Sequence, residues 1–421
     1  MAAPVSLTTG YANTIMSRYL PAFWAGVKED VPFLRRLMAS DNGVKSDPKC
    51  YYVQETVINA IPYSMRVLST EGTTIPAALD VTDVMAKWSL TEHALKKTFS
   101  TRALNEGNLW GSLDIESANM QAAQHEIAHY TKHLLMGDSY GILTRVTEVP
   151  TSLTFKVDNP YALRVGMVID GWTTAAGTGA TADGITITGF DKDTEVFTSA
   201  THSLAVGNYI AYQDVSPNYW GQNLQSLLAN TDARMKGDVV ITPAVAAYAN
   251  LTRASTANWA SFALETNGAY SAKAWARFTS KLVQAQNVST SGINAAYAAP
   301  EAIAALLEAI PEEERLLGDP VGYGTTRPVA LKSQFLTKGT LDLVPVNGFW
   351  PYCIAFLNEN DIGVRWPKEP GWDTSGGTIL TSNVKEVSGQ AGYTAVWLQT
   401  LGLIGRPIEH ALQYGFDYLA G

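Results

Sequence analysis

The chain has 421 residues and a formal net charge of −9, and 46% of its residues are hydrophobic while 16% are charged. This apolar content is ample for the cores of two or three domains and excludes an intrinsically disordered chain. The acidic balance excludes a protein that grips nucleic acid over a broad basic face, because phosphate binding needs clustered Lys and Arg.

Composition also indicates compartment and partners. No stretch stays apolar for the roughly 18 residues of a membrane span, and Met1 to Ser6 lacks a signal-peptide pattern, so we expect a soluble, non-secreted protein without membrane contact. The two cysteines, Cys50 and Cys353, are too far apart for a zinc ribbon and indicate a reducing compartment. Low charge together with 11 Trp and 19 Tyr favours surfaces that face other protein.

The first hundred residues change from helical to extended character. Residues 11–38 carry spaced apolar side chains interrupted by prolines, which predicts short helical pieces in an arm. Residues 52–58 are rich in β-forming types, and Ala86, Trp88 and Leu90 alternate with polar residues. These two candidate strands, joined by a polar connection, predict a long hairpin arm within 41–100.

A helix and a β-rich segment follow. Apolar positions at helical spacing predict a helix from about Leu113 to Met136. In 147–213, the stretch Leu163–Ile169 is echoed by Leu204–Ile210, and β-branched residues lie between them. Short strands at near-regular spacing predict a small barrel or sandwich inserted as its own unit.

The remainder is Ala-rich at first and then rich in strand signals. We expect helices near 219–236, 243–253 and 300–310, and a buried strand at 239–241. Pro311 to Glu314 resembles a helix start, because Pro suits the first helical position and acids suit the positive end of the dipole. Further strands are expected at 352–357 and 393–401.

The helix carries one motif of catalytic type. His125-Glu126-Ile127-Ala128-His129 fits the H-E-x-x-H pattern, in which two histidines bind zinc and the Glu is the general base. The third ligand of the metzincin pattern is missing, because Lys132 and Leu135 stand where Gly and His are needed. Since the motif has only three fixed letters, we favour a partly exposed structural stripe of His125, His129 and His133.

Two other motifs lack the structural context that their chemistry requires. Gly137 to Gly141 fits G-x-S-x-G, but Ser139 follows a helix, whereas the hydrolase elbow needs a preceding strand. Gly177 to Ala182 resembles a dinucleotide loop, yet β-branched residues follow it in place of a helix. The sequence therefore predicts no catalytic, cofactor-binding or metal-binding residue, no cofactor and no enzymatic activity.

The order of elements resembles the major capsid proteins of tailed double-stranded DNA bacteriophages, the Hong Kong 97 fold. The carboxyl segment 393-YTAVWLQTLGLIGRPIEHALQ-413 resembles the closing strand of that family, including the Arg406-Pro407 pair. The resemblance implies an α+β fold with an inserted small β-barrel or sandwich domain. The implied parts are an amino-terminal arm (1–40), an extended β-hairpin loop (41–100), a peripheral domain with the spine helix (101–146), the inserted β domain (147–214), an axial domain (215–385) and a return to the peripheral domain (386–421).

The resemblance also implies a function and partners. It implies a virion protein that self-assembles, as hexamers and pentamers, into the icosahedral head enclosing the phage genome, after assembly in the host cytoplasm. Separate scaffolding, portal and decoration proteins are expected partners, with at most weak non-specific contact with packaged DNA.

The arm is the physical reason to expect association. An isolated two-stranded ribbon buries little and is marginal alone, so a neighbouring subunit would have to cover it. On this hypothesis, contacts between subunits involve Trp88 and the charged residues Lys87, Glu92, Lys96 and Lys97. Two alternatives stay open: a solvated hairpin within a monomer, and a zinc metallopeptidase that uses His125, Glu126 and His129.

Overall fold

The computed structural model is a mixed α and β chain that divides into two compact units. Unit 1 takes its described residues from Met1–Tyr51, Leu90–Met136 and Gly363–Leu403; unit 2 takes them from Tyr52–Ser89, Gly137–Ile362 and Ile404–Gly421. The structure describes residues 23–28, 30–38, 44–46, 52–60, 82–100, 115–137, 141–174, 180–213, 223–228, 233–234, 240–242, 247–253, 256, 259–284, 292–309, 315–316, 330–331, 341–350, 352–373, 381–383 and 392–417.

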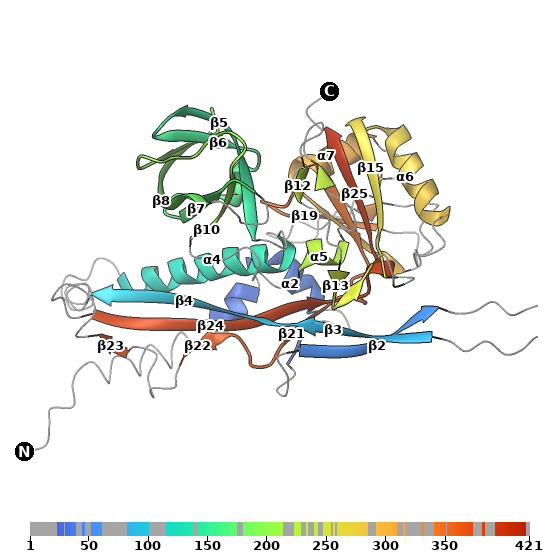
Figure 1. Cartoon of the computed structure of the whole chain (residues 1–421), viewed down its shortest axis with the longest axis horizontal. Helices are drawn as coiled ribbons and strands as arrows, with labels where there is room; N and C mark the ends of the chain where they lie inside the picture. Colours follow the sequence, from blue (N-terminus) through green and yellow to red (C-terminus); the bar gives the residue numbers. More distant parts are fainter. Residues whose placement is uncertain are drawn as a thin grey trace, which may run out of the picture. The chain divides into compact units, whose positions relative to one another are not determined.

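Unit 1 is built around one long strand near the carboxyl end of the sequence. Strand β24 (Gly392–Ile404) pairs antiparallel with β4 (Thr91–Ser100) along almost the whole length of β4 (Figure 1). The sheet also contains β1 (Val44–Ser46), β21 (Gly363–Trp366), β22 (Gly371–Trp372) and β23 (Thr381–Asn383). The strand expected at 393–401 is therefore confirmed.

Aromatic side chains form the core of unit 1. Phe23 lies 5.3 Å from Trp372 and 5.0 Å from Trp397, ring centroid to ring centroid. Trp24 packs edge-on against Trp366 at 6.1 Å. Residues 23–28 are helical, and α2 (Pro32–Leu37) buries Phe33, Leu34 and Leu37, so the expected short helical pieces are confirmed for this part of 11–38.

The long helix of unit 1 is α4 (Ile115–Met136), which confirms the predicted helix. Its apolar face buries Ala123, Ile127, Leu134 and Leu135. A hydrogen bond of 3.2 Å from Thr131 Oγ1 to Gln399 Oε1 joins the helix to β24. The spacing of apolar residues therefore predicts the position of the helix in the sequence, and packing against the sheet stabilises it.

Six strands of unit 2 close into a barrel, in the order β10, β5, β6, β9, β8, β7. Alternate positions along these strands point inward, and the barrel core gathers Val146, Phe155, Ile187, Phe197 and Ile210. The strands are β5 (Ile142–Thr151), β6 (Thr154–Val157), β7 (Val168–Trp172), β8 (Ala180–Asp191), β9 (Val196–Ser199) and β10 (Tyr209–Tyr212).

The echo between the two Leu-x-Val-Gly stretches has a structural basis. Each forms a tight turn, closed by the Met167 N–H to the Arg164 carbonyl and by the Asn208 N–H to the Ala205 carbonyl. Gly166 and Gly207 occupy the third position with φ of 93° and 92°, which a type II turn requires. The glycines are thus selected by backbone conformation.

The second sheet of unit 2 has seven strands. Its centre is apolar, because β20 (Cys353–Leu357) and β16 (Ala295–Ala298) are buried at every position. The order is β15 (Phe262–Ala269), β25 (Ala411–Asp417), β20, β16, β19 (Leu341–Pro345), β18 (Ala330–Leu331) and β17 (Arg315–Leu316). The strand expected at 352–357 is therefore confirmed.

Three helices accompany this sheet. α7 (Pro300–Ala309) confirms the helix expected at 300–310. α6 (Ala272–Gln284) was not predicted from the sequence, and of the stretch 219–236 only α5 (Leu224–Leu228) is helical among the described residues. Pro311 to Glu314 lies outside the described residues.

The helix expected at 243–253 is wrong, because described residues of this stretch form a hairpin. β13 (Ala247–Tyr248) pairs antiparallel with β14 (Leu251–Thr252). The loop residues Ala249 and Asn250 have φ of 51° and 62°, as a two-residue type I′ turn requires. Upstream, the expected strand at 239–241 is found as β12 (Val240–Thr242), paired with β11 (Ala233–Arg234).

We expect Gly166→Ala to destabilise the barrel by about 1 kcal/mol, because a side chain at positive φ is strained. A Cβ at Gly166 would meet nothing within 4 Å, so backbone strain alone would cause the loss. Urea denaturation measures it. Gly189→Ala is the control, since that Cβ would make only ordinary contacts with Thr198; an equal loss in both variants would contradict the explanation.

Candidate functional site

The H-E-x-x-H residues do not share one environment. The His125 side chain is 64% exposed, with Nδ1 3.4 Å from Asp30 Oδ2, and Glu126 is exposed. His129 and His133 are buried, and their ring centroids are 4.6 Å apart. The partly exposed stripe therefore holds only for His125. Among the described residues, no three His, Cys, Asp or Glu side chains are grouped so that they could hold a metal ion.

The other motifs gain no support from the described part of the chain. Ser139 lies outside the described residues, as do Gly177 and Gly179 of the glycine-rich loop. Cys353 is fully buried, and burial raises the pKa of its thiol, which makes it unreactive. No described helix is both long and apolar enough to cross a membrane.

The expected hairpin pairing is confirmed in unit 2. β2 (Tyr52–Ala60) and β3 (Thr82–Ser89) pair antiparallel, with Val53 opposite Trp88 and Thr56 opposite Met85. Thr91–Ser100, by contrast, belongs to the sheet of unit 1 as β4. Glu92 and Lys96, which were expected as arm contacts, are exposed on β4. The side chain of Lys97, the third expected contact, is not among those that the structure describes.

The prediction that Trp88 contacts another subunit is wrong. Its side chain is fully buried, 6.3 Å from the Tyr248 ring and 6.2 Å from the Trp259 ring, all in unit 2. The Lys87 N–H also donates to the Ala249 carbonyl. One end of the hairpin is therefore covered within its own chain.

Other parts of the hairpin remain uncovered. Gln54, Glu55 and Thr56 are exposed on β2, and Asp83 is exposed on β3. Met85 on β3 is 58% exposed, and it is one of six large apolar side chains that are exposed among the described residues. β2 and β3 have only each other as sheet partners among the described residues, and such a two-stranded ribbon is marginal unless something packs on it.

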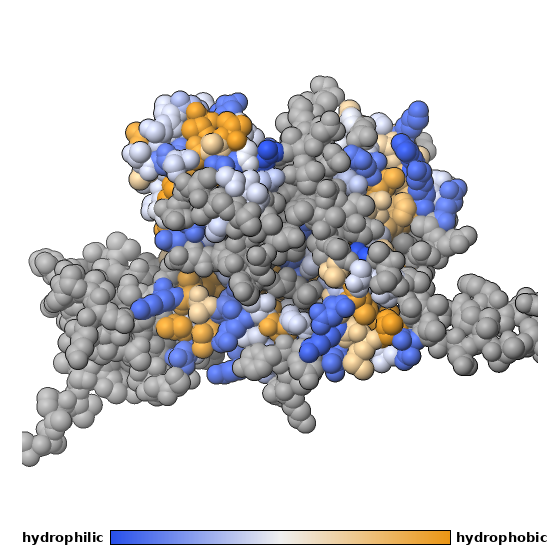
Figure 2. Space-filling model, viewed as in Figure 1, coloured by the Kyte–Doolittle hydropathy of each residue, from blue (hydrophilic) through white to orange (hydrophobic). Residues whose placement is uncertain are grey.

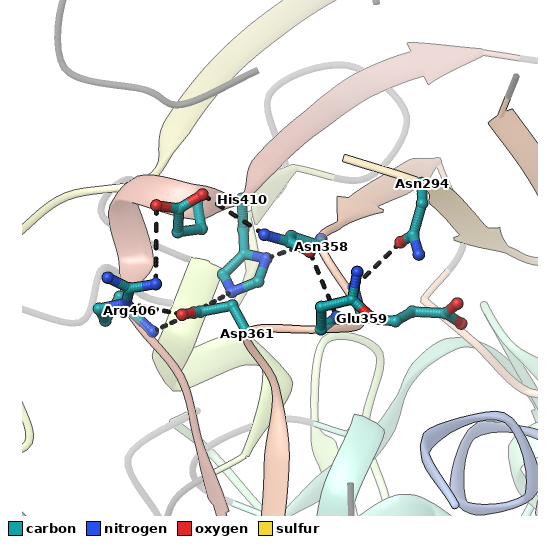
Figure 3. A network of polar contacts seen from close by, with 8 residues as sticks. Asn294, Asn358, Glu359, Asp361, Arg406 and His410 are labelled. Carbon is teal, nitrogen blue, oxygen red and sulfur yellow. Dashed lines mark hydrogen bonds and ion pairs between the residues drawn. The ribbon is translucent and has the colours of Figure 1, made fainter. Parts of the chain in front are cut away.

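A network of charged side chains joins two loops of unit 2 (Figure 3). The Asp361 side chain, 5% exposed, accepts hydrogen bonds from the Arg406 backbone N–H and from Arg406 Nε, both at 2.6 Å. Arg406 Nη2 lies 3.8 Å from Glu409 Oε1. Because one carboxylate holds both the backbone and the guanidinium of Arg406, it defines the path of the chain between β24 and β25.

His410 extends this network into the core. The Asn358 backbone N–H donates to His410 Nδ1 at 3.1 Å, which leaves the ring hydrogen on Nε2, 3.3 Å from Asp361 Oδ2. Burial opposes ionisation of Asp361, but its contacts with His410 and Arg406 outweigh burial and lower its pKa. The carboxylate is therefore charged at neutral pH.

We expect Asp361→Asn to lower the free energy of unfolding by about 2 to 3 kcal/mol at pH 7, because it removes the buried carboxylate that Arg406 and His410 share and leaves Arg406 only the more distant Glu409. A lowered carboxyl pKa contributes stability above the unfolded value near 3.9, and this contribution is lost as pH falls through the folded pKa. Urea denaturation should therefore show the difference in stability between the two proteins shrinking as the pH falls below that unfolded value. A constant difference between pH 7 and pH 3 would contradict the assignment.

A second carboxyl group of unit 2 has the opposite shift. Burial raises the pKa of Asp158 to about 7, although Arg145 opposes the shift. Asp158 Oδ2 is buried without a hydrogen-bond partner among the described residues. The next residue, Asn159, donates through Nδ2 to the Phe349 carbonyl at 3.0 Å, so this carboxyl lies beside a contact between the barrel and the seven-stranded sheet.

Asp158→Asn should stabilise the protein more at pH 8 than at pH 5. The unfolded side chain ionises above about pH 4 while the folded one stays protonated up to about 7, so native stability falls across that interval. A neutral amide removes this dependence. The free energy of unfolding, derived from thermal melts at both pH values, tests this. The gain of the Asp158→Asn variant over the unsubstituted protein should be larger at pH 8 than at pH 5 by about 1 kcal/mol or more, and equal gains would contradict the assignment.

Comparison with known proteins gives a structural likeness to phage capsid chains. No protein-family model and no curated protein matches the chain. A chain of the cyanophage A-1(L) capsid is similar, with a TM-score of 0.50 and 10% identity over 92% of this chain and 93% of that chain. A capsid chain of a native GTA particle gives 0.43 and 10% identity over 91% and 90%, and Mycobacterium phage Patience gives 0.42 and 10% over 100% and 90%.

The likeness to the cyanophage capsid chain concerns the fold. It extends over 92% of this chain and 93% of that chain, so it includes residues of both units. The chain therefore has the mixed α and β fold of a phage capsid protein. The sequence predicted this fold but did not predict the roles of Asp361 and His410. The signal that could have indicated them is the position of polar residues directly beside apolar strands, after β20 and before β25.

Proposed function

We propose that this chain is the shell-forming protein of a tailed-phage head and has a structural, non-enzymatic role. The observation that carries the proposal is the fold likeness to the cyanophage A-1(L) capsid chain over 92% of this chain. Nothing in the described residues supports the zinc-peptidase alternative. The finer assignment is the Hong Kong 97-like fold, with α4 as the spine helix.

The domain limits of the sequence analysis belong to this proposal. Residues 1–40 would be the arm, 41–100 the extended loop, 101–146 and 386–421 the peripheral domain, and 215–385 the axial domain. The barrel would be the inserted domain at 147–214. The pairing of β4 with β24 supports a narrower loop, in which β2 and β3 alone reach toward a neighbour.

The mechanism is geometric. The exposed side chains of β2 and β3 would lie on a neighbouring subunit, while Trp88 anchors the hairpin in its own subunit. Repetition of this contact around symmetry axes would give hexamers and pentamers. Scaffolding, portal and decoration proteins would be further partners in the host cytoplasm, and contact with packaged DNA would be weak.

Electron microscopy and size-exclusion chromatography of the purified chain, with zinc analysis, test the function. We expect closed particles of megadalton size without stoichiometric zinc. A small species with one zinc ion per chain would overturn the proposal in favour of a metallopeptidase.

Met85→Asp should abolish or strongly reduce particle formation, because a buried, unpaired carboxylate in a subunit contact is costly. The fold should survive, since Met85 is 58% exposed, and circular dichroism checks this. Met38→Asp is the matched control, at an exposed methionine of unit 1 outside the hairpin. If the Met85→Asp variant formed normal particles, the exposed face of the hairpin would not be a subunit contact, and that part of the proposal would be wrong.

A further inference from the structure

Helix α6 presents a row of cations to its surroundings. Lys273, Arg277 and Lys281 are exposed and stand four residues apart, so they lie on one face of the helix at steps of about 6 Å. The helix contains no Asp or Glu. The surface along α6 is correspondingly hydrophilic (Figure 2). We call these three residues the basic row.

Packing determines which way the basic row points. The opposite face of α6 buries Trp275 and Phe278, whose rings lie 5.9 Å and 4.6 Å from the ring of Phe356 in β20. This apolar face is covered by the sheet of unit 2. The helix therefore cannot turn its cations inward without exposing two aromatic side chains.

The charges of the row are available to a partner. No ion pair among the described residues involves Lys273, Arg277 or Lys281. The neighbouring helix α7 carries Glu301 and Glu308, and neither is paired with the row. In a chain with a net charge of −9, three cations on one helix face, with no ion pair among the described residues, make a local excess of positive charge.

We propose that the basic row binds the phosphate backbone of double-stranded DNA, without base readout. This inference rests on the proposed function, because it assigns residues to the weak contact between shell and genome. Three cations span about 12 Å, over which a duplex presents roughly seven phosphates. Three such contacts give an attraction that salt weakens, which suits a genome that must be released.

The favoured occupant is DNA, and an acidic surface of a second copy is the competing one. A DNA-filled shell of acidic chains would offer both the phosphates of the genome and the carboxylates of neighbouring copies, so charge alone does not separate the two occupants. Regular spacing along one helix matches a linear array of phosphates, since any register along the duplex satisfies it. The experiment therefore measures DNA binding and particle formation separately.

Fluorescence anisotropy with a labelled, mixed-sequence duplex, between roughly 50 and 200 mM salt, tests the proposal on the full-length chain. The K273Q/R277Q/K281Q variant should bind several-fold more weakly at low salt and reduce the slope of log affinity against log salt by about 2.7, or 0.9 per contact. The R164Q/K192Q/K368Q variant removes three exposed cations elsewhere and should leave the slope unchanged.

Equal losses of DNA affinity in both variants would mean that net charge alone explains the effect, which would overturn the proposal. No loss of affinity in either variant would also overturn it. Unchanged DNA binding with impaired particle formation would assign the row to a contact between copies, which also overturns it. Absence of particles from the unsubstituted chain would contradict the proposed function instead. Electron microscopy of all three proteins therefore separates the two failures.

Discussion

Both units depend on backbone pairing between strands that are far apart in the sequence. β24 supplies the partner for β4 in unit 1, and β25 lies between β15 and β20 in unit 2. Hydrogen bonds of a central strand are satisfied only when both neighbours are present. β24 and β25 therefore complete two sheets, and the side chains that pack on each sheet depend on its being formed.

The turn between these strands shows how polar chemistry supports the pairing. Asp361 holds the backbone and guanidinium of Arg406, and His410 is fully buried beside it. A buried carboxylate is tolerated only with such donors. In the proposed shell, this network would hold the segment between β24 and β25 while the outer surfaces of the hairpin and α6 meet partners.

Sequence reasoning recovered the features that depend on local patterns. Helix α4 was visible because helical spacing is a local signal. The echo of Val165-Gly166 and Val206-Gly207 was also visible, but it was interpreted as strand, whereas the glycines form the turns that precede β7 and β10. The hairpin around Ala249 was mistaken for a helix, because its turn uses residues other than glycine, and a buried Trp259 stabilises it from outside. The position of Trp88 and the Asp361 network depend on contacts that no spacing rule reveals.

The late position of β24 and β25 has a consequence for synthesis. A ribosome must extend the chain to Ile404 before the sheet of unit 1 has its last strand, and to Asp417 before the seven-stranded sheet of unit 2 has β25. In the proposed shell, subunit contacts that need a complete sheet would therefore form only after β24 and β25 have been translated.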